Sequence, residues 1–200
     1  MKKFMLGAFV ILVFSMALML FGNVQAASTK GWLIENGGGT YSVSKGIISL
    51  SGSGIILYEP YVPLKDFTFS LKVEATTLQG FAIMLRGSLP FAGSADGVNF
   101  EFGARDGGSF TLARNAGGWT WTVFTTGAQT NVWYTMKLTV RSNPYTVTAQ
   151  VFTEKSVLLG SYAASDMTSP AFSGIRYIGF GALESGGSYL VKGVSVSRVR

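Results

Sequence analysis

The sequence predicts an all-β fold in which two antiparallel sheets pack face to face, and three observations support this prediction. Short segments alternate between apolar and polar residues and are rich in Val, Ile, Thr, Phe, Tyr and Trp. Paired and tripled glycines separate these segments. Beyond the N-terminal region no apolar stripe has a helical period. Strands that are apolar on one face only, in a chain without helices, need a second sheet to cover that face. The large number of strands indicates a jelly roll.

Fourteen segments carry the strand pattern. In chain order they are 31–35, 40–43, 46–50, 54–58, 66–74, 80–86, 98–105, 109–114, 119–125, 132–141, 145–154, 156–163, 176–182 and 188–198. The clearest are FTFSLKV (67–73) and YTMKLTVR (134–141), in which every second residue is apolar. Ser142-Asn143-Pro144 separates two long segments, which predicts a hairpin there.

Residues 1–26 are interpreted as a signal peptide. Lys2 and Lys3 precede an almost unbroken apolar run from Met5 to Gly22, and Val24-Gln25-Ala26 is a small-residue cleavage site. The run is also close to the ~18 residues that can span a bilayer, so an uncleaved anchor is the alternative. A pilin-type leader is a third interpretation, but the apolar run lacks an early acidic residue. We expect residues 27–200 to be a single β-sandwich domain outside the cytoplasmic membrane, extracellular or at the cell surface.

The composition excludes several common functions. The chain has no Cys and no His, so disulfides, Ser-His-Asp or Cys-His catalysis and His-ligated zinc are all excluded. Its formal net charge is +6, and removing Lys2 and Lys3 leaves +4 on residues 27–200. The basic residues are scattered rather than clustered, so no nucleic-acid partner is expected.

The stretch VNFEFGARDGGSFTLARN (98–115) predicts a hairpin with two distinct faces. A three-residue loop at Asp106-Gly107-Gly108 keeps each cross-strand pair on one face. The core face then holds Phe100, Phe102, Ala104, Phe110 and Leu112. The outer face holds Asn99, Glu101, Gly103, Arg105, Thr111 and Ala113.

The outer face of this hairpin is the candidate binding site. Gly103, Thr111 and Ala113 would form a shallow floor, with Asn99, Glu101 and Arg105 around it and Arg86 joining from the preceding strand. Paired donors and acceptors on an open floor suit the hydroxyl groups of a sugar. The alternative is a solvated sheet face, on which Glu101 pairs weakly with Arg86 or Arg105.

Trp119 and Trp121 follow the hairpin. A four-residue loop over 115–118 would place Trp121 opposite Leu112 and both tryptophans in the core, which is the favoured expectation. A one-residue bulge would instead turn both outward, where they would form an aromatic platform for a sugar.

From Asp66 to Val196 the chain resembles the concanavalin A-like lectin/glucanase superfamily, which includes laminin G-like domains. The resemblance rests on DFTFSLKVEA, GFAIMLRGS, GVNFEFGARDGGSFTLARNAGGWTWTVF, NVWYTMKLTVRSN and IGFGALESGGSYLVKGVSVS in the superfamily's usual order. It implies a two-sheet jelly roll. Members bind glycans, hydrolyse them, bind proteins or build structure, so the resemblance leaves the function open.

The same resemblance supplies two tests of chemistry. The glucanase branch carries its catalytic carboxylates on one strand as E-x-D-x-(x)-E, and here no acidic residue lies within four residues of another. Many members hold a calcium ion near the rim of the sandwich. Asp96-Gly97 and Asp106-Gly107 could supply ligands, but Asp-Gly is also ordinary turn chemistry, so no cofactor is expected.

Three functions follow in order of preference. The first is a secreted, non-catalytic carbohydrate-binding or adhesion module, whose partner is a glycan or polysaccharide. The second is a structural subunit of an extracellular filament, sheath or surface layer, in which residues 27–43 donate a strand to a neighbour's sheet edge. The third is a glycoside hydrolase with dispersed carboxylates. Membrane contact is expected only through the N-terminal segment, if it is uncleaved.

Overall fold

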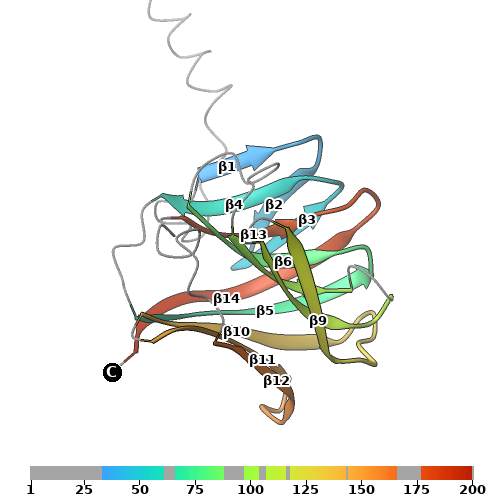
Figure 1. The fold of residues 1–200 in the computed structure, drawn as a ribbon. Coiled ribbons are helices and arrows are strands. Elements are labelled where there is room, and N and C mark those ends of the chain that lie inside the picture. The colour runs from blue at the N-terminus through green and yellow to red at the C-terminus, as the bar shows by residue number, and fades with distance from the viewer. Residues whose placement is uncertain are drawn as a thin grey trace, which may run out of the picture.

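Two seven-stranded antiparallel sheets face each other in the computed structural model (Figure 1). The structure describes residues 33–60, 66–87, 97–103, 107–115, 118–142, 144–165 and 177–199. In spatial order, sheet A contains β1 (Leu33–Asn36), β4 (Ile55–Pro60), β13 (Tyr177–Ala182), β6 (Phe81–Arg86), β7 (Gly97–Phe102), β8 (Phe110–Asn115) and β9 (Trp119–Thr125). Sheet B contains β12 (Leu158–Ala164), β11 (Tyr145–Thr153), β10 (Trp133–Ser142), β5 (Phe67–Thr77), β14 (Ser188–Arg198), β3 (Ile47–Ser51) and β2 (Thr40–Ser44).

The predicted all-β sandwich is confirmed, and each of the fourteen predicted segments corresponds to an observed strand. The signal peptide, its cleavage site and the ends of three predicted strands, 31–32, 104–105 and 176, lie outside the described residues. Within the described ranges, no helix is long and apolar enough to cross a membrane.

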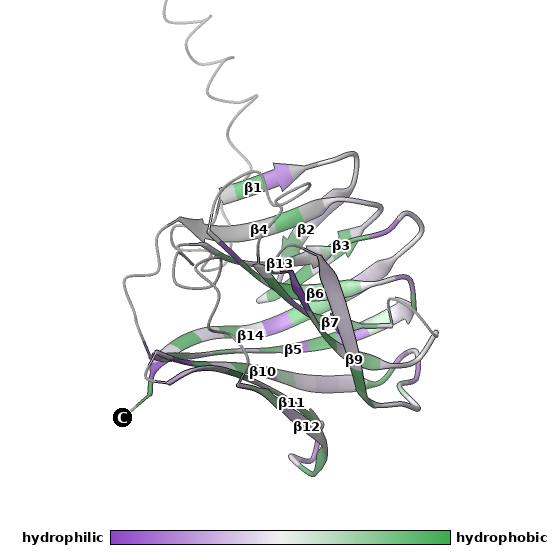
Figure 2. Ribbon diagram, viewed as in Figure 1, coloured by the Kyte–Doolittle hydropathy of each residue, from purple (hydrophilic) through white to green (hydrophobic). Residues whose placement is uncertain are grey.

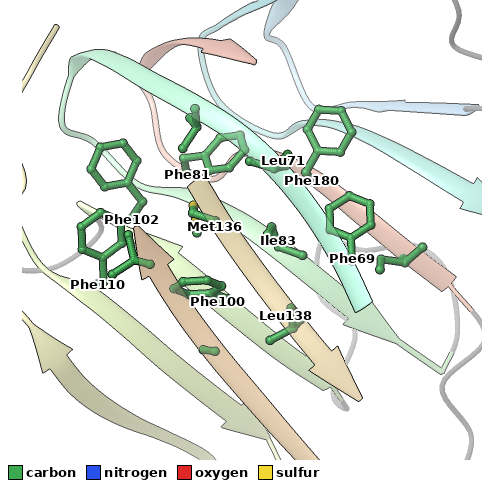
Figure 3. Close-up of a cluster of buried hydrophobic side chains, with 14 of the residues drawn as sticks. Phe69, Leu71, Phe81, Ile83, Phe100, Phe102, Phe110, Met136, Leu138 and Phe180 are labelled. Carbon is green, nitrogen blue, oxygen red and sulfur yellow. The ribbon is translucent and has the colours of Figure 1, made fainter. Parts of the chain in front are cut away.

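The core lies between the sheets and is built by alternate residues of the strands. On β5, Phe67, Phe69, Leu71 and Val73 are at most 2% exposed, as their alternation predicts. Figure 2 shows hydrophobic and hydrophilic residues alternating along β5 and β10. Phenylalanines from both sheets meet in the middle of the core with Met136 and Leu138 of β10 (Figure 3). Packing of the two apolar faces therefore fixes which face of each sheet points inward.

The β7–β8 hairpin keeps its predicted faces but not its predicted register. Phe102 pairs with Phe110 rather than with Leu112, because β7 ends at Phe102. Gly103 leaves the strand with a φ of 72°, and its N–H donates to the carbonyl of Ser109 at 2.8 Å. The pairing is shifted by two residues, so the described side chains of β7 and β8 stay on their predicted faces. Phe100, Phe102, Phe110 and Leu112 are all buried in the core as expected.

The two sheets approach each other closely at one edge. There β9, the last strand of sheet A, contacts β12, the last strand of sheet B. A Cβ on Gly160 of β12 would lie 2.8 Å from the Cβ of Thr125 on β9. The absence of a side chain at Gly160 therefore permits this close approach.

Candidate functional site

The strand pairing of sheet A brings the predicted site residues together on its outer face. Directly paired residues of antiparallel strands project to the same side of the sheet. One row across the sheet runs through Glu35, Ile56, Gly181, Ala82, Glu101, Thr111 and Val123. The neighbouring row includes Met84, Asn99, Ala113 and Trp121, and the next includes Tyr177, Arg86, Gly97, Asn115 and Trp119. We call these residues the outer face of sheet A.

The middle of this face is buried. Arg86 is 3% exposed, Asn99 7%, Glu101 5% and Thr111 1%. The alternative of a solvated sheet face is therefore wrong, and the expected open floor is not observed either. Buried polar side chains need hydrogen-bond partners, so their contacts decide what this face can do.

Three of these polar side chains form a chain of hydrogen bonds. Nη2 of Arg86 donates to Oδ1 of Asn99 at 2.7 Å, and Nδ2 of Asn99 donates to Oε1 of Glu101 at 3.1 Å. Nη1 of Arg86 also donates to the carbonyls of Leu85 at 2.9 Å and Val98 at 3.1 Å. Asn99 thus links the cation to the carboxylate and fixes the orientation of both. We call Arg86, Asn99 and Glu101 the polar network.

Burying the charged guanidinium of Arg86 is unfavourable, and its hydrogen bonds and the nearby carboxylates oppose this effect. Burial lowers the pKa of Arg86 from 12.5 to about 10, while the negative charges of Glu101 and Glu35 act in the opposite direction. A pKa of about 10 still leaves the side chain charged at neutral pH. A buried charge with oriented partners is a common feature of functional sites.

Glu35 is a member of this face that the sequence did not single out. It lies on β1, in the same row as Glu101, and its charge raises the pKa of Arg86. The two carboxylates come from strands 66 residues apart in the chain (101 minus 35). The alternation of apolar Ile34 with charged Glu35 in LIEN is the signal that could have placed Glu35 on an outer face.

Two glycines have clear structural requirements at this site. At Gly97 the backbone φ is 152°, and a Cβ would lie 2.3 Å from the carbonyl oxygen of Leu85 and 2.7 Å from Nη1 of Arg86. Gly97 therefore makes room for the guanidinium. Gly103 was expected to form part of an open floor, and it does not do so. It follows the last residue of β7, and a Cβ there would lie 3.0 Å from Cδ2 of Leu78, a partly buried residue at the core.

A small apolar cluster lies beside the polar network on the same face. It consists of Ile56, Ala82 and Met84, with Tyr177 and Leu183 packed against it. This cluster is separate from the main core, on the other side of sheet A. The outer face of sheet A therefore combines an apolar cluster with a few polar side chains, as ligand sites commonly do.

Trp119 and Trp121 lie on the outer face, so the expectation that they are core residues is wrong. Trp119 pairs with Asn115 and Trp121 with Ala113, because β8 extends to Asn115 and the connection shortens to residues 116–118. One residue fewer in the loop moves both rings to the opposite face. Their centroids are 6.1 Å apart with an interplanar angle of 26°, and Trp121 is 41% exposed.

Trp119 connects this aromatic pair to the polar network. Cζ of Arg86 lies 5.6 Å from the centroid of the Trp119 ring, within the range of a cation–π contact. Trp121 continues the stack toward solvent beside Val123, which is 44% exposed. At the edge of the face Trp121 is thus an exposed aromatic ring, and its neighbour Trp119 packs against the buried guanidinium of Arg86.

Several predicted residues lie outside the described ranges. They are Arg105, the third polar residue of the predicted floor, and Asp96 and Asp106, the two candidate calcium ligands. In the described part of the chain, no three residues among His, Cys, Asp and Glu are grouped as a metal site would require. The direct contact of Arg86, Asn99, Glu101 and Thr111 with a ligand stays a prediction.

No family model and no curated protein matches this chain. Solved structures do resemble it. A legume lectin-like domain from Entamoeba histolytica has a TM-score of 0.62 at 14% identity, over 86% of this chain and 91% of that one. The exoplasmic/lumenal domain of VIP36 in a Ca2+/Man-bound form has a TM-score of 0.61 at 12% identity, over 88% and 86%. The CBM2 module of the evolved Dit protein of Lactobacillus casei phage J-1 has a TM-score of 0.55 at 13% identity, over 88% and 94%.

These likenesses agree with the two-sheet antiparallel sandwich described above. At such low sequence identity they show the fold and not the function. The chain has a concanavalin A-like lectin fold.

Proposed function

We propose that this protein is a non-catalytic glycan-binding module, exported to the cell surface or beyond. The observation that carries the proposal is the stacked pair Trp119–Trp121, whose outer ring is 41% exposed and whose inner ring lies over the buried guanidinium of Arg86. An exposed aromatic face binds the C–H face of a sugar ring, since both surfaces are flat and weakly polar.

The polar network would act mainly as a support for this platform. Arg86 is held by Asn99 and two backbone carbonyls, so Trp119 rests on a fixed cation. A preorganised aromatic surface loses little entropy when a weak ligand binds. Glu35, which is half-buried, would supply a hydroxyl acceptor to a sugar that extends along the face.

The similar structures support the glycan class. One is described as bound to Ca2+ and Man, and another as a CBM2 module. Export rests on the apolar N-terminal segment with its small-residue cleavage site. The non-catalytic assignment rests on the lack of any local pair of carboxylates in the sequence.

A glycan array followed by affinity electrophoresis on the positive polysaccharides tests the proposal. We expect Trp121→Ala to weaken binding on the order of tenfold or more, because a central aromatic contact is lost. Trp133→Ala is the matched control, since Trp133 is a partly buried tryptophan on the other sheet. Unchanged retardation of Trp121→Ala, or no binding of the wild type to any glycan, overturns the proposal.

Two further measurements separate neighbouring hypotheses. Binding with calcium and with EDTA tests whether a calcium ion contributes, as the resemblance suggests for many members. Release of reducing ends from bound polysaccharides, compared between wild type and Glu101→Gln, tests for hydrolysis. Release that the Glu101→Gln change abolishes would replace the binding module with a glycoside hydrolase.

Self-association into a surface structure is the second candidate function. β2 and β12 end sheet B, and β1 and β9 end sheet A, so each strand has an edge without a partner strand among the described residues. Such edges can pair with a strand of another molecule. Size-exclusion chromatography and electron microscopy test it, and a monomer at high concentration contradicts it.

A further inference from the structure

A row of side chains crosses the outer face of sheet B, on the opposite side of the molecule from the glycan site proposed above. Pairing of five neighbouring strands places Lys192, Lys72, Thr135, Phe152 and Leu158 in this row. Directly paired residues project to the same side, so Lys192, Lys72, Thr135 and Phe152 face away from the core. The pairing with β12 shifts register at Phe152, and Leu158 beyond this shift is 50% exposed. The row is basic on β14 and β5, and apolar on β11 and β12.

Aromatic rings hold two lysines on this face. Nζ of Lys192 lies 3.7 Å from the ring centroid of Trp133, and Nζ of Lys137 lies 4.8 Å from that of Phe152. These are cation–π contacts, which position an ammonium group while leaving N–H donors for an anion. We call Lys72, Lys137, Lys192, Trp133 and Phe152 the basic face.

The basic face carries a charge repulsion that an anionic partner would relieve. Lys72 and Lys192 are directly paired across β5 and β14, and like charges in that arrangement destabilise a sheet. Acidic Glu74 shares the face, one row away beside Trp133. The lysines still outnumber it three to one, so the face is positive.

The apolar end of the row continues into an exposed turn. Val157 is 59% exposed, Leu158 50% and Leu159 44%, and the three are consecutive. The turn is ordered by hydrogen bonds from the Ser156 N–H to the Thr153 carbonyl at 3.0 Å and from the Thr153 N–H to the Val157 carbonyl at 2.9 Å. It lies at the end of the β11–β12 hairpin, at the bottom of the molecule as drawn in Figure 1. Single exposed aliphatic residues are ordinary, but a run of three beside a positive face indicates an interaction surface.

We propose that the basic face and residues 157–159 together dock on an anionic phospholipid bilayer. The aliphatic side chains would enter the boundary between headgroups and acyl chains, while the lysines meet the phosphate groups. Trp133 and Phe152 would sit at headgroup depth, where aromatic residues are favoured. Stable peripheral binding needs an apolar and an electrostatic contribution, and this surface supplies both.

Two other occupants fit the surface less well. A second copy docked face to face would bring two basic faces together, which is repulsive. An acidic polysaccharide would neutralise the lysines but leave Val157, Leu158 and Leu159 in water. A bilayer accounts for both halves of the row.

The test uses the full chain, labelled at one introduced cysteine with a polarity-sensitive dye. The chain has no cysteine of its own, so the label reports one position. Lys155→Cys places the dye beside the apolar turn, and Thr130→Cys, in the turn before β10, is the control. Because the dye reports local polarity, binding through the apolar N-terminal segment does not imitate insertion of this turn.

We expect a blue shift of the dye at residue 155, but not at 130, with phosphatidylcholine–phosphatidylglycerol vesicles and not with phosphatidylcholine alone. Lys72→Gln and Lys192→Gln should each raise, about fivefold, the lipid concentration that gives half of the maximal shift. Leu158→Ser with Leu159→Ser should abolish the shift. All these variants are at exposed or half-exposed positions, and circular dichroism verifies their folding.

Three results overturn the proposal. The first is a shift of equal size at residue 130, or no shift at 155. The second is a shift without vesicles that grows with protein concentration, which indicates self-association. The third is lysine-dependent binding of polygalacturonate with no vesicle-induced shift, which indicates an acidic polymer. None of these results bears on Trp121, so the glycan proposal is tested separately.

Discussion

The guanidinium carbon of Arg86 lies 5.6 Å from the centroid of the Trp119 ring. This contact joins the centre of sheet A to its edge, because Arg86 belongs to β6 and Trp119 to β9. Two strands, β7 and β8, lie between them. The long arginine side chain therefore reaches across Gly97 and Asn115, the residues that pair between it and the tryptophan. A surface tryptophan thus depends on a buried hydrogen-bond network for its position.

Asn99→Ala should destabilise the protein. It removes the acceptor of the 2.7 Å bond from Arg86 and the donor of the 3.1 Å bond to Glu101, inside a buried region. We expect a loss of about 1–3 kcal/mol in the free energy of unfolding, measured by urea denaturation. Thr120→Ala is the control, because Thr120 is exposed and its hydroxyl makes only a 3.5 Å contact. Equal stability of Asn99→Ala and wild type would contradict the network's role.

Gly97→Ala should destabilise the protein strongly, although it adds only one methyl group. The added Cβ would lie 2.3 Å from the carbonyl oxygen of Leu85, in a backbone conformation that other residues rarely adopt. We expect a loss of more than about 2 kcal/mol and a weakened β6–β7 pairing. Gly118→Ala, where a Cβ meets nothing within 4 Å, should change stability by less than about 0.5 kcal/mol. Hydrogen exchange of the β6 and β7 amides would locate the damage, and unaltered protection there would argue against this account.

Gly160→Ala should loosen the edge where the two sheets meet. Its Cβ would lie 2.8 Å from the Thr125 Cβ and 3.2 Å from Cδ2 of Phe124. We expect a loss of about 1–3 kcal/mol, seen as a lower thermal midpoint. Adding Thr125→Gly should restore part of it, because the double variant removes the crowding. A double variant no better than the sum of its two single changes would show that this contact is not the cause.

Tyr145 should make stability depend on pH at the alkaline end. Burial raises its pKa from 10.0 to about 12, so the unfolded chain releases this proton at a lower pH than the folded protein does. The stabilisation is fully present below about pH 10 and is lost as the pH rises toward 12. The advantage of wild type over Tyr145→Phe in urea unfolding should therefore shrink over that window, by an amount on the order of 2 kcal/mol. The pKa of a free tyrosine is about 10. A difference in stability that stays constant from about pH 9 to about pH 12 would therefore exclude this pH dependence.

Much of the fold could be predicted because strand alternation is a local property. The spacing of Phe67, Phe69 and Leu71 identifies a strand and its apolar side without any knowledge of its partners. The β7–β8 hairpin kept its faces despite a two-residue error in register, since a shift of two preserves the side on which each residue lies.

The tryptophans could not be placed in this way, because an error of one residue in a loop reverses the face. Whether the connection before Trp119 begins at residue 115 or 116 depends on Asn115 staying paired with Gly97. The guanidinium of Arg86 belongs to the same row and occupies the space over Gly97. The relevant contact joins residues far apart in the chain, and no local pattern contains it.

The sequence by itself determined that this chain is a two-sheet sandwich, which side of its clearest strands faces the core, and that Arg86, Asn99 and Glu101 share a face. Only the tertiary structure decided that this face is buried, that Glu35 joins it from β1, and that Trp119 and Trp121 border it. Alternation fixes the side of a sheet on which a residue lies. Solvent exposure and proximity depend on which distant strands pair, and packing over the whole molecule sets those pairings.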